Sequence, residues 1–444
     1  MPKNTVLICS PSYAVRGGVE SIINDLTREL PSRGWDAVLG LAKGSHFNDV
    51  SRYREAHRDL PIVEIDGTRG TRQARVDALK TIIRRVKPDI VLSARIYDVF
   101  PAVSSLKSTG KSPRLAITIQ GYESQYFYDA HLYRDNLDLC VAAGNMISKA
   151  AVEWCGLPEE RVVSIPGVVR PPFCEPTPRR LGEQLHIGYV GRLDQSDKRV
   201  LDLVSLVRFL DQTDLRYLFR VVGDGTEREV MCESLKDQIA QGRLVFEGWK
   251  NHTQLYEEVY PNLDCFVNFS PAEGVSVGGG EAMAHGVVPV VSQCIGIKTE
   301  QQYVEGVNSL TFPVGDIATA SGNILRLWDE PGLLTRLSSE AARRMRDGRY
   351  SFSSVIDSWA DAFDRCLAQP PRTGALPSVS PAKDGRLASM GFPPAVAQHL
   401  RNFVGRRHNH ADPGGEWPTG SGLLTEDAAT EIMRFAAEYE NSRC

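Results

Sequence analysis

Short apolar runs alternate with helix-length amphipathic segments along most of this chain, and the series of alternations occurs twice. The first series starts with VLICSPS at 6–12, and the segment after it repeats apolar residues at three- and four-residue steps until Gly34. Such alternation is typical of parallel strands joined by covering helices. The sequence therefore predicts an α/β fold with two doubly wound, Rossmann-like domains.

A proline-rich stretch without helical period separates the two series, and the composition changes again after the second. The tail that follows has two weaker helical patterns, and we expect it to be a separable appendage. The predicted organisation is a first Rossmann-like domain at 1–168, an interdomain linker at 169–182, a second Rossmann-like domain at 183–350, a helix crossing back to the first domain at 351–369, and a linker and tail at 370–444.

Composition excludes several classes of protein. Lys and Arg number 51 against 55 Asp and Glu in 444 residues, a formal charge of −4, which disfavours bulk nucleic-acid binding. No apolar run approaches the roughly 20 residues of a membrane-spanning helix, and the N-terminus does not resemble a signal peptide. We therefore expect a soluble, cytoplasmic protein. The nine cysteines form no C-x-x-C pair, which favours buried, reduced thiols over disulfides or a metal site.

The strongest local signal is a pair of glutamates, Glu273 and Glu281, separated by seven residues between a predicted strand and a helix that opens at EAMA. A carboxylate accepts hydrogen bonds from vicinal hydroxyls, and free N–H groups at a helix start suit phosphate oxygens. Both features together describe a nucleotide sugar. The alternative is two solvated charges. The glycines at 278–280 cost roughly 1 kcal/mol each relative to alanine in a helix, which indicates that something needs the backbone close there.

Two cations provide a second signal, because Arg192 and Lys198 follow the run LHIGYV at the expected carboxyl edge of the second sheet. A diphosphate would be held at such a strand-to-helix connection. Two loop cations are often only solvent-exposed charges. Their coincidence with the glutamate pair favours diphosphate binding.

Glycines provide a third signal. Gly17 and Gly18 occupy the first strand-to-helix turn, where a side chain would keep a ligand from the helix N-terminus. Gly223 begins a GDG sequence that lacks the third glycine of a dinucleotide fingerprint. We interpret it as a turn beside a nucleotide base, and the missing fingerprint disfavours an oxidoreductase.

These segments together resemble the family-4 glycosyltransferases, a large retaining family with the GT-B fold. The resemblance covers about residues 5–369. It rests on GGVE at 17–20, VGRLDQSDKR at 190–199, VVGDG at 221–225, FEGW at 246–249, and the two glutamates followed by AMAHGVVPVV. It implies a GT-B fold with a cleft between two Rossmann-like domains, the first binding the acceptor and the second the nucleotide sugar, plus a C-terminal extension outside the family core.

The resemblance also implies an activity, the transfer of a hexosyl unit from a nucleoside diphosphate sugar to an acceptor hydroxyl. A UDP-sugar is favoured, the anomeric configuration would be retained, and no metal or other cofactor is implied. Arg192 and Lys198 would neutralise the leaving diphosphate and Glu273 would contact the donor sugar, so these three are the catalytic candidates. The implied donor-binding residues are Gly17, Gly18, Gly223, Trp249, Gly274, Val275, Ser276, Val277 and Glu281, and the implied acceptor-side residues are Gln120 and Tyr122.

The sequence departs from the family pattern at Gln120, where many members carry His, and at 278–280, where bulky apolar residues are usual. These departures leave a second hypothesis open, a catalytically silent GT-B module that binds nucleotide or glycan. The acceptor of an active enzyme would be a glycan, a lipid-linked molecule or a small molecule. Residues 52–114 hold fourteen Lys or Arg against seven acids. Exposed helix faces explain this excess, and the alternative is a peripheral contact with anionic lipid at the inner membrane surface.

Overall fold

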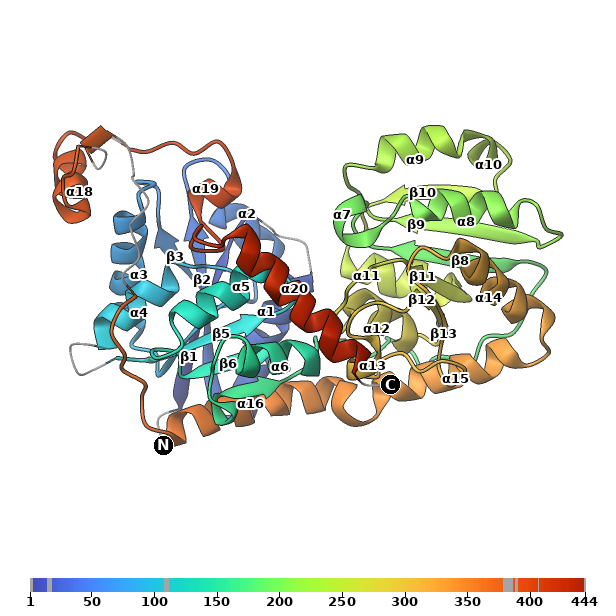
Figure 1. Ribbon diagram of the computed structural model, residues 1–444, viewed down its shortest axis with the longest axis horizontal. Coiled ribbons are helices and arrows are strands. Elements are labelled where there is room, and N and C mark those ends of the chain that lie inside the picture. Colours follow the sequence, from blue (N-terminus) through green and yellow to red (C-terminus); the bar gives the residue numbers. More distant parts are fainter. Residues whose placement is uncertain are drawn as a thin grey trace. The chain divides into compact units, whose positions relative to one another are not determined.

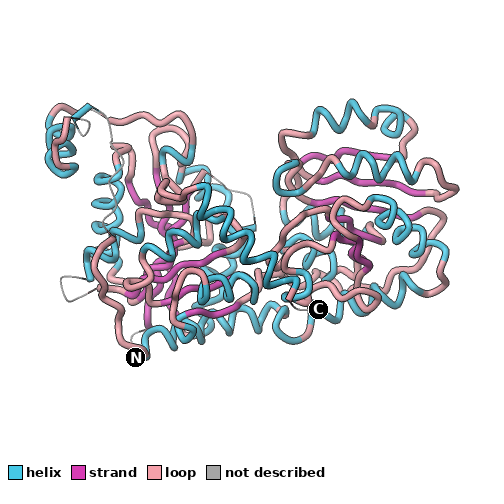
Figure 2. Tube along the Cα trace, in the orientation of Figure 1, coloured by secondary structure: helices cyan, strands magenta, loops and turns pink. Residues whose placement is uncertain are grey.

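The computed structural model describes residues 3–13, 18–107, 112–377, 386–387, 390–405 and 407–442. The chain folds into two compact units. Unit 1 comprises 1–165 together with 356–435, and unit 2 comprises 166–355 together with 436–444. Each unit has a parallel sheet at its centre, drawn magenta in Figure 2, and helices cover both faces of each sheet (Figure 1).

Unit 1 contains a seven-stranded sheet in the order β3-β2-β1-β4-β5-β6-β7 with parallel pairings throughout. The strand order reverses between β1 and β4, which makes this the topological switch point of a doubly wound sheet. The strands are β1 (Asn4–Pro11), β2 (Trp35–Lys43), β3 (Ile62–Asp66), β4 (Ile90–Ser93), β5 (Arg114–Ile119), β6 (Leu139–Ala142) and β7 (Val162–Ser164). The helices between them are α1 (Gly18–Glu29), α2 (Val50–Ala56), α3 (Arg72–Val86), α4 (Val99–Lys107), α5 (Ser124–Leu132) and α6 (Asn145–Glu153).

Unit 2 contains a six-stranded parallel sheet in the order β10-β9-β8-β11-β12-β13, with its switch point between β8 and β11. The strands are β8 (Leu185–Val190), β9 (Tyr217–Val222), β10 (Leu244–Gly248), β11 (Cys265–Asn268), β12 (Val288–Ser292) and β13 (Leu310–Phe312). The helices are α7 (Gln195–Lys198), α8 (Asp202–Leu210), α9 (Arg228–Ser234), α10 (Lys236–Ala240), α11 (His252–Gln254), α12 (Val277–Ala284), α13 (Ile297–Glu300), α14 (Ile317–Asp329) and α15 (Leu333–Arg346).

The predicted α/β pattern is confirmed in both units. The first apolar run forms β1, whose residues Val6, Leu7 and Ile8 are fully buried, as expected for a central strand covered on both faces. The helical segment after β1 ends as predicted at Gly34, which adopts φ 88° and donates its N–H to Leu30 O. One boundary differs, because α12 begins at Val277 rather than at EAMA, so Glu281 lies in its second turn.

The chain after unit 2 continues as α16 (Phe352–Ala368), and the two weaker helical patterns of the tail form α18 (Pro394–Phe403) and α20 (Glu426–Asn441). The expectation that the tail is a separable appendage is wrong. Trp417, just after the short helix α19 (Pro413–Glu416), is fully buried in the core of unit 1 with Ile432. Its indole Nε1 donates to Lys43 O at 3.1 Å, at the end of β2.

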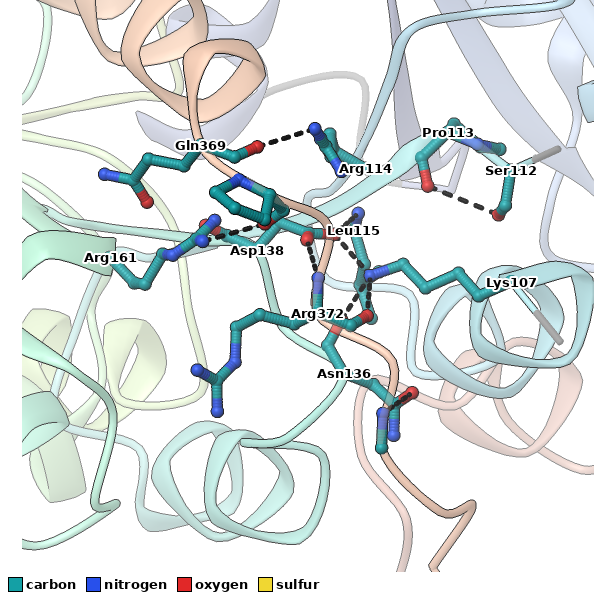
Figure 3. Close-up of polar contacts among 12 residues, drawn as sticks. Lys107, Ser112, Pro113, Arg114, Leu115, Asn136, Asp138, Arg161, Gln369 and Arg372 are labelled. Atoms are coloured by element: carbon teal, nitrogen blue, oxygen red, sulfur yellow. Dashed lines mark hydrogen bonds and ion pairs between the residues drawn. The ribbon is translucent and has the colours of Figure 1, made fainter. Parts of the chain in front are cut away.

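A second anchor of the tail lies where the extended segment after α16 passes the start of β6 (Figure 3). Asp138 is fully buried, pairs with Lys107, and accepts hydrogen bonds from the backbone N–H groups of Leu115 and Arg372 at 2.7 and 2.8 Å. Arg161 donates to Pro370 O at 2.8 Å. A buried ion pair is costly unless its remaining hydrogen-bonding groups are satisfied, and the tail backbone satisfies them here. The start of the tail is therefore part of unit 1.

Eight cysteines lie among the described residues, all of them as free thiols, and Cys9, Cys140, Cys155, Cys265, Cys294 and Cys366 are buried. Burial raises the pKa of Cys140 to about 12, which keeps that thiol protonated and unreactive. None of the helices among the described residues has the length and apolar character needed to cross a bilayer.

Candidate functional site

The predicted site residues of unit 2 gather at the carboxyl end of its sheet, around the switch point between β8 and β11. Arg192 and Lys198 follow β8, and Glu273 follows β11. Open parallel sheets bind ligands outside the carboxyl ends of the strands at such a point. The topology therefore brings together residues that are 75 positions apart in the sequence.

Lys198 and Glu273 form an ion pair across this switch point, with Nζ and Oε1 2.5 Å apart. The loop that carries Glu273 is fixed by its own backbone, because the N–H of Glu273 donates to Ile295 O at 3.0 Å. The amide of Asn268, the last residue of β11, donates to the same Oε1 at 3.3 Å. Glu273 is thus held at a defined place by one cation and one amide.

Burial raises the pKa of Glu273, but the Lys198 ammonium and the hydrogen bonds to the carboxylate outweigh that effect, so its pKa lies below its usual range. Glu273 is therefore ionised at neutral pH. The side chains of Lys198 and Glu273 are 26% and 15% exposed. An anion that takes Lys198 as its partner would release a charged carboxylate at the same place.

Arg192 lies at the surface of this edge, and its guanidinium pairs with Asp197 at 2.6 Å. The Arg192 side chain is 65% exposed. The hydroxyl of Tyr189 donates to the Arg192 carbonyl at 2.7 Å, which fixes the backbone of the loop and leaves the side chain in solvent. A surface ion pair of this kind contributes little stability, so Arg192 can exchange Asp197 for another anion at small cost.

Helix α12 starts beside Glu273. Ser276 caps it by accepting the N–H of Gly279 at 3.2 Å, and the Ser276 N–H itself donates to Gln302 Oε1 at 2.9 Å. The Ser276 N–H is therefore bonded within unit 2, in contrast to the free N–H groups expected at this helix start. The N–H groups of Gly274, Val275, Val277 and Gly278 find no acceptor among the residues that the structure describes. These are the orphan donors that a helix start offers to an anion.

The glycine run at 278–280 has two different explanations. A Cβ on Gly279 would lie 1.8 Å from the Tyr303 hydroxyl, and one on Gly280 would lie 2.9 Å from both Met345 Cε and Val169 Cγ2. The close approach expected at these two positions is thus to the protein's own side chains. A Cβ on Gly278 would meet only Val190 O, at 3.7 Å. No described residue requires a glycine there.

Glu281 is 8% exposed, and its carboxylate accepts a hydrogen bond from the buried Tyr260 hydroxyl at 2.8 Å. The backbone carbonyl of Glu281 contacts His285 Nδ1 at 2.7 Å. The second glutamate of the pair is therefore oriented from inside unit 2, in contrast to Glu273 at the edge of the sheet.

The GDG sequence packs backbone against backbone. A Cβ on Gly223 would lie 1.9 Å from Gly191 O, and the Gly223 N–H donates to Gly248 O at 2.8 Å. Gly223 thus ties the ends of β8, β9 and β10 together at one edge. Trp249, directly after β10, is 42% exposed at that same edge.

The predicted residues of unit 1 lie at the carboxyl end of its own sheet. Gly18 is the first residue of α1, and a Cβ there would meet no atom within 4 Å. Gly17 lies outside the described residues. Gln120 and Tyr122 follow β5, and the Gln120 amide donates to the Thr118 hydroxyl.

Sequence reasoning missed Arg95, which follows β4 at the switch point of unit 1 with φ 69°. Its guanidinium donates to the Tyr13 hydroxyl at 3.3 Å and contacts Glu20, which is almost fully buried in α1, at 3.5 Å. Burial raises the pKa of Glu20, and Arg95 offsets part of that shift. The available signal was an arginine directly after a short apolar run, the same pattern that pointed to Arg192.

Known proteins resemble this chain in sequence and in fold. Residues 184–330 match the family model of the Glycosyl transferases group 1. Over 166 residues the chain is 30% identical to the lipopolysaccharide core biosynthesis glycosyltransferase LpsD of Rhizobium meliloti (strain 1021). That match spans 37% of this chain and 46% of the relative, so it covers about half of the length of that protein.

Solved structures are similar over most of the chain. The lipopolysaccharide outer core galactosyltransferase WaaB has a TM-score of 0.62 at 17% identity, covering 81% of this chain and 99% of that one. HepE of Anabaena, in complex with UDP and glucose, has a TM-score of 0.64 at 14% identity, covering 81% and 99%. Sucrose-phosphate synthase of Thermosynechococcus elongatus has a TM-score of 0.67 at 15% identity, covering 82% and 100%. The fold of this chain is therefore GT-B, with two Rossmann-like α/β domains built on parallel sheets.

Proposed function

We propose that this chain is a retaining glycosyltransferase that moves a hexosyl unit from a nucleoside diphosphate sugar, with a UDP-sugar favoured, to an acceptor hydroxyl. The observation that carries the proposal is the Lys198–Glu273 ion pair at the switch point of unit 2, next to the unpaired N–H groups at the start of α12. The match of residues 184–330 and the UDP and glucose named for HepE support the same donor class.

In this proposal the diphosphate replaces Glu273 as the partner of Lys198. The orphan N–H groups of α12 and the exposed Arg192 are further donors to the diphosphate. Phosphate oxygens are strong acceptors for such a set, and the positive charge stabilises the leaving group as the glycosidic bond breaks. Glu273 is then released from Lys198 but still held by Asn268. Its carboxylate would accept a hydrogen bond from a hydroxyl of the donor sugar and so orient the sugar. Lys198 and Arg192 supply the positive charge, so the proposal includes no resident metal.

The acceptor in this proposal is a glycan, a lipid-linked molecule or a small molecule, bound by unit 1 through Gln120 and Tyr122. The lipopolysaccharide relatives support a glycan of the cell envelope. Retention of the anomeric configuration is proposed on the resemblance to family-4 enzymes alone.

A panel of UDP-glucose, UDP-N-acetylglucosamine and GDP-mannose tests the proposal, first by the shift in unfolding temperature and then by donor hydrolysis. A ligand at 100 times its dissociation constant adds about 2.7 kcal/mol of stability, which a thermal scan detects. Lys198→Met should abolish both responses, and Lys236→Met is the matched control, because Lys236 forms an exposed ion pair with Glu233 in the same unit. Binding without hydrolysis or transfer by the wild type would favour a silent binding module instead.

We also propose a peripheral contact of unit 1 with anionic lipid, carried by α18. Its outward face exposes Val396, Leu400 and Phe403, the last at 87%. Basic residues lie beside it: Arg401 is in the last turn of α18, and Arg69, just before α3, donates to Asn402 of α18 at 2.7 Å. An apolar helix face beside basic residues is the pattern of an interfacial helix.

A further inference from the structure

The loop that follows β2 wraps around one carboxylate of the tail. The backbone N–H groups of Ser45 and His46 donate to Glu416 Oε1 at 2.5 and 2.8 Å, and those of Phe47 and Asn48 donate to Oε2 at 3.0 and 2.9 Å. The Ser45 hydroxyl and the Asn48 amide add two side-chain donors at 3.2 and 3.0 Å. We call this loop, residues 45–48, the Glu416 nest.

The nest is built to hold an anion. Glu416 is 1% exposed, and no lysine or arginine pairs with it within the described parts of the chain. Burial raises the pKa of Glu416, but the Asn48 amide and the backbone donors outweigh that effect and lower it to about 2. Gly44 makes room for the carboxylate, because a Cβ there would lie 1.9 Å from Glu416 Cδ.

Asn48 connects the nest to the end of β1. Its Nδ2 donates to Glu416, while its Oδ1 accepts the backbone N–H groups of Ser12 and Tyr13 at 3.0 and 3.3 Å. An amide has distinct donor and acceptor ends, so an anion in the nest fixes which end faces β1. Without Glu416, the Asn48 oxygen is held toward Ser12 and Tyr13 only by their own N–H groups, and the Asn48 Nδ2 loses its acceptor.

Tyr13 carries the connection to the switch point of unit 1. Its hydroxyl accepts from Arg95, which follows β4 and also contacts Glu20. β1 and β4 are the neighbouring strands between which the order of the sheet reverses. Ligands of doubly wound sheets bind at that point. A chain of contacts therefore runs from Glu416 through Asn48 to Tyr13 and Arg95.

We propose that Glu416 is a positioning residue for the reaction. Through Asn48 it fixes the Ser12–Tyr13 backbone and hence the Tyr13–Arg95 pair at the switch point of unit 1. The effect on the reaction rests on the proposed function, whereas the effect on Ser12 and Tyr13 does not. The tail thus belongs to the machinery of the enzyme, and the nest would accept a small carboxylate in place of the Glu416 side chain.

The test uses the full chain with Glu416→Ala, with and without added formate, at a temperature where circular dichroism shows every variant fully folded. Hydrogen exchange read by mass spectrometry follows the amides of Ser12 and Tyr13. The control is Val103→Ala. This change leaves a cavity at a fully buried position of α4 in the core of unit 1 and alters no residue of the nest. UDP-glucose hydrolysis is measured on the same samples, with kcat and KM separated.

We expect Glu416→Ala to speed exchange at Ser12 and Tyr13, to lower kcat about tenfold, and to leave the KM for UDP-glucose within about twofold, because the loss is one of positioning. Formate should restore both the protection and kcat in a saturable manner. Asn48→Ala should reproduce the loss, and the double variant should be no worse than either single one. Val103→Ala should lose stability only, with no response to formate.

Unchanged protection of Ser12 and Tyr13 in Glu416→Ala would overturn the proposal, and so would an equal loss of kcat in Val103→Ala. If the wild type hydrolyses no nucleotide sugar, the proposed function fails, and the hydrogen-exchange measurements still decide whether Glu416 positions the end of β1.

Discussion

Replacing Gly278 by alanine separates what helix α12 needs from what a ligand needs. The new methyl group would lie 3.7 Å from its nearest neighbour, Val190 O, which is an ordinary van der Waals contact. Alanine in place of glycine stabilises a helix by roughly 0.5–1 kcal/mol. For a unit of this size that corresponds to an unfolding temperature higher by about 1–4 °C. Gly278→Ala should therefore stabilise the free protein.

The same methyl group would stand among the orphan N–H groups of α12 where the proposal places the diphosphate. We expect UDP binding and UDP-glucose hydrolysis to weaken at least about tenfold, equivalent to roughly 1.4 kcal/mol, although the protein has become more stable. Thermal scans with and without UDP, together with a hydrolysis assay, measure both effects on one sample.

Gly279→Ala is the matched control, because its Cβ would lie 1.8 Å from the Tyr303 hydroxyl. Overpacking of this kind costs about 1–3 kcal/mol, so this variant should unfold at a lower temperature. A Gly278→Ala protein with higher stability and unchanged hydrolysis would refute the idea that a ligand approaches this helix start. A Gly278→Ala protein with lower stability would refute the inference that there is room for a methyl group at position 278.

Four further outcomes are expected. Glu273→Gln should chiefly lower kcat, by about a hundredfold, and Glu281→Gln should chiefly raise the KM for the donor; the reverse pattern in steady-state kinetics would exchange their roles. The pKa of Glu416 is lowered to about 2, so its charge stabilises the fold above its ordinary pKa of 4.5 and less as the pH falls towards 2. In urea unfolding, the free energy of unfolding of the wild type should exceed that of Glu416→Gln by about 3 kcal/mol at pH 7, and this difference should be smaller by about 1.4 kcal/mol at pH 3.5. A difference that does not change with pH would contradict this prediction. A chain that ends after residue 372 should be insoluble or unfold at a lower temperature, because the buried Trp417 is lost from the core of unit 1; equal stability would contradict this. Phe403→Ser should reduce pelleting with liposomes that contain anionic lipid, and binding that is equal with neutral liposomes would argue against an electrostatic contribution.

The sequence was sufficient to predict the α/β fold and the position of Lys198 and Glu273 at one edge of the second sheet. Lys198 and Glu273 each follow an apolar run, and the carboxyl ends of parallel strands meet at one edge, so their proximity follows from the pattern alone. The contact between Glu281 and Tyr260 did not follow, because it depends on how α12 packs over the sheet. The reason for Gly279 and Gly280 was equally hidden, since Tyr303 and Met345 reach them from distant segments.

The tail was the part that the sequence could not predict. Trp417 is a single aromatic residue in a stretch without helical or strand period, and its pocket is formed by strands about 350–380 positions earlier. The Glu416 nest could not be predicted from the sequence either, because most of its donors are backbone N–H groups that any residue other than proline can supply. Only the loop conformation at 45–48 turns them toward one point.

The tail also sets an order of events during synthesis. Unit 1 begins at the start of this chain, yet its core is complete only when Trp417 and Ile432 arrive, after all of 166–355 has been translated. At roughly 5–20 residues per second, the 252 residues from 166 to 417 take roughly 13–50 s. During that interval the nascent sheet of unit 1 has an unfilled core, while the main part of unit 2 is contiguous and can fold at once. The main part of the second unit can thus fold before the core of the first unit is complete, although the first unit is translated earlier.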